Sequence, residues 1–356
     1  MKILFLNGKY PFCYYYRGYL PAIYSNQECI GEFLHLLDET PKDIVSKKIY
    51  NADVVVMQRP NTQEALNLAK LLKGIGKKVI FENDDTYLYG KGIDPNLLEN
   101  DEQRKKAKEI STITNEILKI ADGAIASTPI LADEYRQVNS NVCVLKNCID
   151  PLDELPCKKN TTGKFRIGFI GSVTSNEDYV HIKEQIKQLD DRGDITIVVF
   201  GIKHKDGSTL SFMKKDRMFW ESLKNVEWQH YVPVLKYFTT LASLALDVII
   251  IPRNDSYFNR CKSNLKFLEA SLLKIPVIAQ GFDGSPYEQD KDYLTLVYDN
   301  NDWYNTIIRI KENYNTYKEL AVRAHDYVLE NYNIKKYAQE WVEEINKLCS
   351  RTNGKS

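Results

Sequence analysis

The sequence lacks paired cysteines and any surplus of one charge. Its seven cysteines are odd in number, widely scattered and without a CxxC pair. This pattern argues against a disulfide framework and against a zinc site, and it favours reduced thiols in a cytoplasmic protein. The cysteines stand at positions 13, 29, 143, 148, 157, 261 and 349.

Long apolar runs are absent as well. No run approaches the roughly 18 residues of a membrane span, so we expect no transmembrane segment. The chain begins Met-Lys-Ile-Leu-Phe-Leu-Asn-Gly, whose apolar stretch is too short for a signal peptide and indicates a first β-strand. The expected location is cytoplasmic, and peripheral association with the inner membrane surface stays open.

The charges balance completely. Lys plus Arg total 48 and Asp plus Glu total 48, whereas nucleic-acid binders usually carry a basic surplus, so no nucleic-acid partner is expected. The chain has 356 residues, 43% hydrophobic and 27% charged, which is ordinary for a globular protein and predicts two domains. The 23 tyrosines suit contacts with sugars or bases, although a biased composition is the preferred explanation.

Short apolar runs alternate with amphipathic stretches, which predicts an α/β fold with parallel sheets covered on both faces. A linker at 151–163 separates two such arrays. We therefore expect two doubly wound, Rossmann-like domains, over 1–155 and 160–330, facing a cleft. The expected strands are 2–6, 53–57, 78–82, 123–126, 141–145, 165–171, 195–201, 226–230, 246–252, 276–280 and 294–298. The expected helices are 62–73, 101–120, one from about 128, 236–246, 262–274 and several from 303 to about 347.

The segment 258–269 carries the sharpest chemical pattern. Lys262, Lys266 and Glu269 stand at i, i+4 and i+7, so on one helix their side chains share a face. The N-terminus of such a helix favours phosphate, two ammonium groups suit a diphosphate, and the carboxylate can accept both hydroxyls of a ribose. A surface Lys–Glu helix with routine ion pairs is the plain alternative.

The stretch 247–280 resembles the nucleotide-binding part of the retaining GT-B glycosyltransferases, the group 1 or family 4-like enzymes. The resemblance rests on a strand ending in Pro252, a lysine-bearing helix with an acidic residue, and a following Pro-Val-Ile run. In that family the second glutamate of a pair binds the donor ribose, and Glu269 matches it. The first glutamate lies eight residues earlier, where this chain has Cys261, so retention or inversion of configuration stays open.

The chain is closer to a divergent branch with the pattern Phe-Asn-x-x-Lys-Ser-x-x-Lys-x-x-Glu. This resemblance implies that Asn259, Lys262 and Lys266 lie near the donor phosphates, with Ser263 in the same donor site. It also implies the GT-B fold, in which the last helix, about 332–350, crosses back to the N-terminal domain.

Weaker resemblances mark the rest of the donor domain. Gly171 and Ser172 match the glycine turn that opens it, where backbone approaches a phosphate or sugar, although such turns are common in α/β proteins. Tyr231 and Val232 match the loop that holds the nucleotide base, and an ordinary turn is an equal alternative.

The N-terminal half is expected to bind the acceptor. Tyr16 and Arg17 resemble a Tyr-Arg element of the same branch, and they can stack on a sugar and hold an anionic group; tyrosine-rich packing is the alternative. Asp84 and Asp85 follow an expected strand and suit a general base, a sugar-hydroxyl ligand or a metal ligand, with helix capping as the alternative. No metal is expected, because the Asp-x-Asp metal site belongs to the GT-A fold, which has one nucleotide domain.

The resemblance thus implies a hexosyltransferase of polysaccharide or glycoconjugate biosynthesis. It would move sugar from a nucleotide diphosphate sugar to a glycan, lipid-linked or protein hydroxyl, with retention, without a metal and without a cofactor. Asp84, Asp85 and Lys262 are the expected catalytic residues. A nucleotide-sugar 2-epimerase and a non-catalytic nucleotide-sugar-binding protein are the alternatives, and Cys261 favours the latter.

Overall fold

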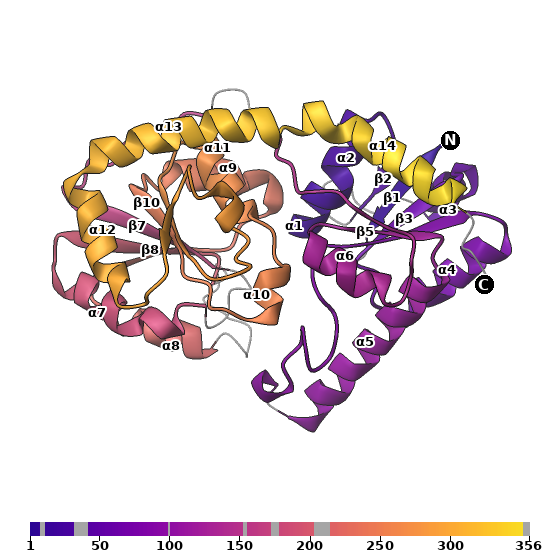
Figure 1. Ribbon diagram of the computed structural model, residues 1–356, viewed down its shortest axis with the longest axis horizontal. Coiled ribbons are helices and arrows are strands. Elements are labelled where there is room, and N and C mark those ends of the chain that lie inside the picture. The colour runs from indigo at the N-terminus through magenta and orange to yellow at the C-terminus, as the bar shows by residue number, and fades with distance from the viewer. Residues whose placement is uncertain are drawn as a thin grey trace. The chain divides into compact units, whose positions relative to one another are not determined.

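The chain forms two compact units in a computed structural model (Figure 1). Unit 1 is Met1–Asp150 with Arg260–Ser263 and Tyr332–Ser356, and unit 2 is Pro151–Asn259 with Asn264–Asn331. The structure describes residues 1–7, 11–31, 42–98, 100–151, 155–171, 178–202 and 214–351. Each unit contains a six-stranded sheet whose neighbouring strands are all parallel, which confirms the predicted α/β class.

The sheet of unit 1 has the strand order β2-β1-β3-β4-β5-β6. This is the flavodoxin-like order, in which the chain direction reverses across the sheet between β1 and β3. Ligands of such sheets bind at the carboxyl ends of the strands near that reversal. The strands are β1 (Ile3–Asn7), β2 (Glu28–Ile30), β3 (Val54–Gln58), β4 (Lys78–Asn83), β5 (Gly123–Ala126) and β6 (Val142–Val144).

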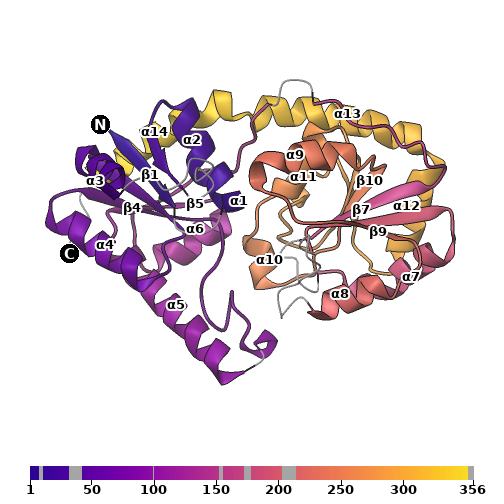
Figure 2. The same ribbon diagram turned by 180° about the vertical axis from the view of Figure 1, so that it is seen from behind.

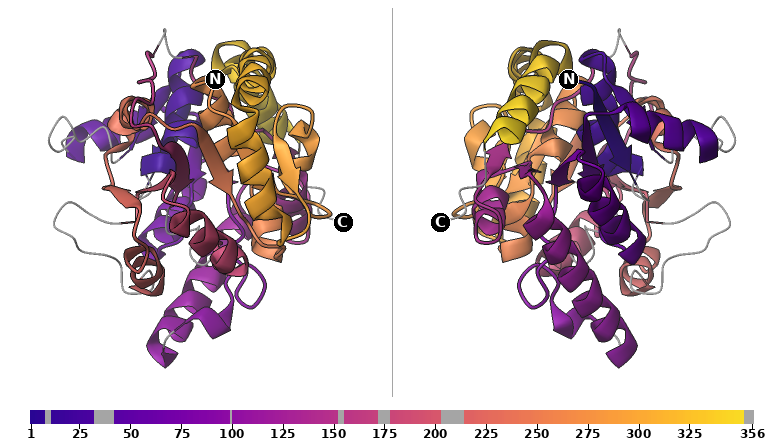
Figure 3. Two further views of the ribbon diagram at one scale, coloured as in Figure 1. Left: turned by 90° about the vertical axis from the view of Figure 1, so that its left-hand side faces the viewer. Right: turned by 90° about the vertical axis from the view of Figure 1, so that its right-hand side faces the viewer.

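Helices cover both faces of this sheet. One face packs against the N-terminal helices and the last helix in a core that includes Phe5, Val56 and Trp341. The other face packs against α4 and α6, and α5 runs beside α4, with its N-terminal end projecting from the unit (Figure 3). The helices are α1 (Pro11–Tyr14), the π-helix η1 (Tyr15–Tyr19), α2 (Leu20–Tyr24), α3 (Lys42–Asn51), α4 (Gln63–Gly74), the 3₁₀-helix η3 (Pro95–Leu97), α5 (Asp101–Ile120), α6 (Pro129–Arg136) and α14 (Ile334–Ser350).

The sheet of unit 2 has the order β12-β11-β10-β7-β8-β9. Counted within the unit, this is the six-stranded Rossmann order, and its reversal lies between β7 and β10. Every residue of β7, β8, β10 and β11 is buried, as a sheet covered on both faces requires. The strands are β7 (Phe165–Ile170), β8 (Ile195–Phe200), β9 (Val226–Gln229), β10 (Val248–Ile251), β11 (Val277–Gln280) and β12 (Thr295–Val297).

A hydrophobic core of unit 2 lies on one face of its sheet, where Trp220 and Trp303 from α8 and α12 are fully buried. Helices α9 and α11 lie on the other face (Figures 1 and 2). The helices are the 3₁₀-helix η5 (Val180–Ile182), α7 (Lys183–Asp191), α8 (Lys214–Glu221), α9 (Val234–Ser243), α10 (Tyr257–Cys261), α11 (Leu265–Leu272), the 3₁₀-helix η7 (Glu288–Asp290), α12 (Asp302–Glu312) and α13 (Tyr314–Asn331).

One expected helix is wrong. The predicted helix over 262–274 is replaced by α10 and α11, and Lys262 and Ser263 lie in the break between them. Asn264 stands at the N-cap position of α11, and its buried side chain donates to Asp290 Oδ2 at 2.7 Å instead of capping the helix. Within the described residues, no helix is long and apolar enough to cross a membrane.

Candidate functional site

Lys266 and Glu269 lie on α11, at the carboxyl end of the sheet in unit 2. The Lys266 ammonium donates to the Ile170 carbonyl at 2.7 Å, which places a positive charge at the end of β7, beside the reversal of the sheet. Glu269 is 7% exposed, and its Oε2 accepts a hydrogen bond from the Tyr237 hydroxyl at 2.8 Å. Tyr237 stacks in turn on Phe200 at the end of β8, with ring centroids 5.5 Å apart.

This arrangement fixes the Glu269 carboxylate. Burial and the neighbouring carboxylate raise the pKa of Tyr237 well above its ordinary value, so its hydroxyl keeps its proton and stays a donor. A buried carboxylate with one oxygen held in this way has a set orientation and suits the recognition of paired hydroxyls. Lys266 and Glu269 therefore remain together on one element, as the spacing predicts.

The turn after β7 is tightly packed. Gly171 donates its backbone N–H to the Phe200 carbonyl at 2.8 Å, and a Cβ at this position would come within 2.7 Å of Ile202. A side chain here would therefore push the two strand ends apart. Ser172, the other residue expected in this turn, lies outside the described residues.

The Asn259 side chain is held inside unit 2. It is 3% exposed, and its Nδ2 donates to Asp178 Oδ1 at 3.1 Å and to Asn254 Oδ1 at 2.8 Å. These contacts anchor the loop after β10 to the start of η5. That Asn259 lies near the donor phosphates stays a prediction.

The two residues expected in the loop after β9 differ in exposure. Tyr231 is exposed at the carboxyl end of the strand, and partial burial raises the pKa of its hydroxyl. Val232 is buried. An exposed ring at this edge can stack on a flat ligand such as a base, whereas Val232 can offer a ligand only its backbone.

In unit 1, Asp84 and Asp85 follow β4 and meet two cationic side chains. The Arg59 guanidinium lies 3.5 Å from Asp84 Oδ1 and 3.1 Å from Asp85 Oδ2, and the Lys262 ammonium bonds to Asp85 Oδ1. The Asp84 side chain is 15% exposed and the Asp85 side chain 6%. Two carboxylates and two cations thus form a balanced, largely buried cluster at the carboxyl edge of the sheet.

Arg59 is the residue of this cluster that the sequence analysis missed. It follows β3 directly, with a left-handed backbone at φ +49°, and its N–H donates to the Glu82 carbonyl at 2.8 Å. Its guanidinium also donates to Cys13 Sγ at 2.9 Å. A left-handed residue other than glycine is uncommon and often marks a functional site. The one available signal was a charged residue placed directly after an apolar strand.

Replacing Arg59 tests its role in the cluster. We expect Arg59→Ala to lower the free energy of unfolding by about 1–3 kcal/mol, because the buried carboxylates lose charged hydrogen bonds. Arg59→Gly is expected to retain about 1 kcal/mol more than Arg59→Ala, because glycine adopts the left-handed backbone without strain. Urea unfolding of both variants measures the loss of the charged hydrogen bonds and the backbone strain. Equal stabilities of the two variants would show that the backbone is not strained.

Arg17 and Glu82 form a second ion pair, which is entirely internal. Both side chains are 0% exposed, and Arg17 Nε lies 2.6 Å from Glu82 Oε1. Arg17 Nη1 also donates to the Leu145 carbonyl at 2.6 Å, and its guanidinium lies 4.6 Å from the ring centroid of Trp341. Burial raises the pKa of Glu82 to about 7, against the opposing effect of Arg17.

This burial corrects the expectation for the Tyr-Arg element. Tyr16 is 3% exposed and lies with Arg17 in the π-helix η1, so neither side chain presents a surface to an acceptor. A buried guanidinium needs an anionic partner, and Glu82 supplies it from across the sheet. The tyrosine-rich segment packs the core beneath the site.

The segment Arg260–Ser263 belongs to unit 1. Ser263 Oγ accepts from Asn147 Nδ2 at 2.7 Å, and the Cys261 carbonyl accepts from Thr128 Oγ1 at 3.0 Å. Lys262 therefore joins Asp85 and leaves the helix face that Lys266 and Glu269 share. Within the part of the chain that the structure describes, no three His, Cys, Asp or Glu side chains gather as a metal site.

Comparisons with known proteins identify the fold. No protein-family model and no curated protein sequence matches the chain. The crystal structure of Anabaena HepE in complex with UDP-glucose matches at a TM-score of 0.65 and 15% identity, over 98% of this chain and 100% of the other.

Two further crystal structures match over nearly the whole chain. A glycosyltransferase from Rickettsia africae has a TM-score of 0.63 and 11% identity, covering 99% of each chain. A UDP-forming α,α-trehalose-phosphate synthase from Burkholderia xenovorans has a TM-score of 0.59 and 10% identity, over 96% of this chain and 87% of the other. At such identities these matches establish the fold, which is that of the GT-B glycosyltransferases.

Proposed function

We propose that this protein is a glycosyltransferase that moves a hexosyl group from a nucleotide diphosphate sugar to a hydroxyl acceptor. The observation that carries the proposal is the pairing of Glu269 with Tyr237, beside Lys266 at the end of β7. This group lies at the reversal of a Rossmann-ordered sheet, where dinucleotide-binding proteins hold their ligands. The GT-B fold and a neighbour crystallised with UDP-glucose support the same assignment.

Unit 2 is proposed to bind the donor. Glu269 accepts the two hydroxyls of the ribose, Lys266 and the Gly171 turn approach the diphosphate, and the loop of Tyr231 and Val232 holds the base. Fixed positive charge and backbone N–H groups stabilise the departing diphosphate in a transfer that needs no metal. Retention of configuration is part of the proposal.

Unit 1 is proposed to bind the acceptor, which is a glycan, a lipid-linked sugar or a protein. Asp84 is the more exposed carboxylate of its cluster and is assigned to the acceptor hydroxyl, from which it accepts the hydrogen bond. Arg59 and Lys262 hold Asp85, and through it they hold the turn that carries Asp84. A positioned base of this kind contributes about 10²–10⁴ to a rate.

A panel of nucleotide sugars with glycan and lipid-linked acceptors tests the proposal. Release of nucleoside diphosphate together with a glycosylated acceptor supports transfer. Isomerised donor without release would replace the proposal with epimerisation. Tight donor binding without turnover would identify a non-catalytic binder, the candidate favoured by the buried Cys261 at the position of a family glutamate.

The donor site makes a separate prediction. We expect Lys266→Ala and Glu269→Ala each to weaken donor binding or turnover by about tenfold or more, which corresponds to about 1.4 kcal/mol. Tyr237→Phe is expected to have a smaller effect in the same direction, because it releases one carboxylate oxygen of Glu269. Titration calorimetry with the nucleoside diphosphate measures the change.

Lys236→Ala is the matched control, because Lys236 is exposed on α9, next to Tyr237. Its affinity is expected to equal that of the wild type. Wild-type affinity in both Lys266→Ala and Glu269→Ala, with folding intact, would refute the donor site.

A further inference from the structure

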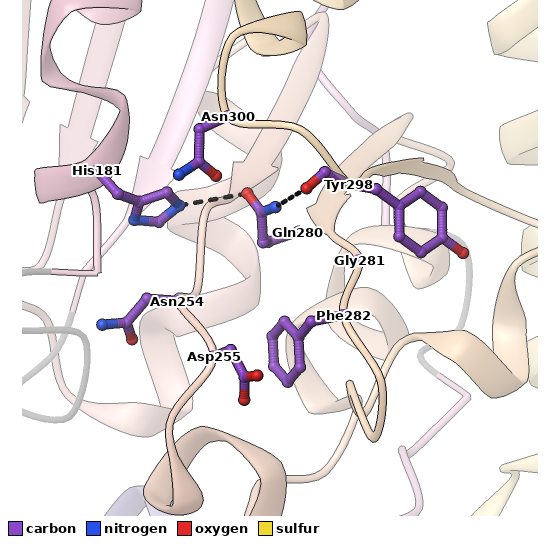
Figure 4. Close-up of a pocket in the computed structure, with 8 residues that line it drawn as sticks. All are labelled: His181, Asn254, Asp255, Gln280, Gly281, Phe282, Tyr298 and Asn300. Atoms are coloured by element: carbon purple, nitrogen blue, oxygen red, sulfur yellow. Dashed lines mark hydrogen bonds between the residues drawn. The ribbon is translucent and has the colours of Figure 1, made fainter.

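A hollow lies in unit 2 at the carboxyl ends of three neighbouring strands, β10, β11 and β12 (Figure 4). Its volume is about 220 Å³. Sites for drug-sized ligands hold about 300–1,000 Å³, so this hollow suits a single ring and is too small for a nucleotide. It is lined by His181, Asn254, Asp255, Gln280, Gly281, Phe282, Tyr298 and Asn300.

Gln280 forms a rigid wall of the hollow. The Trp303 indole N–H donates to Gln280 Oε1 at 2.7 Å, and Gln280 Nε2 donates to the Tyr298 carbonyl at 3.3 Å. Because an indole nitrogen only donates, Oε1 is the acceptor, and His181 Nε2, 3.2 Å away, must carry the proton toward it. The other ring nitrogen of a neutral His181 is then an acceptor.

The lining is largely apolar in area, with several polar groups, and none of its eight described residues is an arginine or a lysine. Burial lowers the pKa of His181, which favours the uncharged ring at neutral pH. The eight lining residues therefore offer amides, one imidazole and one carboxylate, and no fixed cation for a phosphate. This composition distinguishes the hollow from the Lys266 side of the same sheet edge.

Hydroxyl groups match this lining best. Asn300 is an exposed amide that can both donate to and accept from a hydroxyl, Asn254 can donate through its Nδ2, and Asp255 can accept. The Phe282 ring lies beside Asp255 in Figure 4 and gives the hollow an apolar side. A sugar ring combines these features, since its hydroxyls point outward and its C–H face packs on an aromatic ring.

We propose that this hollow binds one hexose-sized sugar ring. The site goes beyond the donor assignment, because it lies over β10, β11 and β12, whereas Lys266 and Glu269 lie toward β7 and β8. The ring can come from two sources, the sugar of a nucleotide sugar or one unit of a glycan. Both present the same hydroxyl chemistry.

Saturation-transfer NMR on the full chain tests the site. The probes are methyl glycosides of glucose, galactose, mannose and N-acetylglucosamine, together with UDP and the UDP-sugars. The variants are Asn300→Ala and Phe282→Ala, and the matched control is Asn305→Ala, an exposed asparagine on α12. Unfolding midpoints establish that each variant is folded, and Asn300→Ala keeps the test valid if Phe282→Ala does not fold.

We expect the variants to weaken sugar binding by about fivefold or more, with UDP binding unchanged. Loss of methyl glycoside binding with UDP-sugar binding retained identifies a glycan site. Loss of UDP-sugar affinity with UDP affinity retained identifies the sugar of the donor. Wild-type affinity of both variants for every glycoside and UDP-sugar overturns the proposal. Glycoside binding is measured without turnover. A negative result in the transferase assay therefore does not decide whether this hollow binds a sugar.

Discussion

Replacing Asp84 with asparagine is expected to lower the turnover number by about 10²–10⁴ and to leave donor affinity near that of the wild type. Asparagine keeps the shape of the side chain and its place 3.5 Å from Arg59, but it accepts no proton. The donor contacts proposed for Lys266 and Glu269 belong to the other unit of the chain and are unaffected. The rate of nucleoside diphosphate release at saturating donor and acceptor measures the effect.

Asp85→Asn provides the first comparison. The Asp85 side chain is 6% exposed and bonded to both Arg59 and Lys262, so its loss is expected to reduce stability more than Asp84→Asn does. Asp101→Asn is the neutral control, because that side chain is fully exposed at the start of α5. A turnover in Asp84→Asn within threefold of the wild type would refute the assignment of Asp84.

Much of the fold follows from local pattern. The six strands of unit 2 stand within two residues of the runs that predict them. Four of them, β7, β8, β10 and β11, are buried on both faces and therefore carry long apolar runs. β2 (Glu28–Ile30) was not predicted, because it is short and only half-buried and so carries no apolar signal. An apolar run therefore predicts most directly a strand that is buried along its whole length.

Local sequence pattern predicts less of the candidate site than of the fold. Spacing places Lys266 and Glu269 on one helix correctly, but it does not show the break between α10 and α11, which leaves Lys262 outside both helices. The partner of Arg17 lies 65 residues away, so its burial depends on strand order. Arg59 has a left-handed backbone, which a sequence indicates only where glycine stands.

Arg17 and Arg59 both belong to a group of packed charges at the carboxyl edge of unit 1. In the register of the sheet, Asn7 lies beside Gln58, and Gln58 lies beside Glu82, so polar residues end three adjacent strands. Arg17 and Arg59 pair with carboxylates that follow or end β4. One pair is internal and supports the edge, and the other lies nearer the surface, where chemistry is proposed.

Breaking the internal pair is expected to have the largest effect on stability. Arg17→Met leaves Glu82 buried without its cation, and we expect the free energy of unfolding at pH 8 to fall by about 3–5 kcal/mol. Arg17→Met combined with Glu82→Gln is expected to recover most of this loss, because no charge is then buried. Arg136→Met is the control, since it breaks an exposed pair with Asp133 worth less than about 1 kcal/mol.

The pH dependence separates charge from packing. The pKa of folded Glu82 is raised from 4.5 to about 7, so the folded protein binds more protons in this window and its stability falls as pH rises through it. Without Arg17 the pKa rises further, and the loss continues above pH 7. The deficit of Arg17→Met is therefore expected to be larger at pH 8 than at pH 5, as measured by urea unfolding. An equal deficit at both values would mean that Arg17 acts by packing over Trp341 and not by pairing with Glu82.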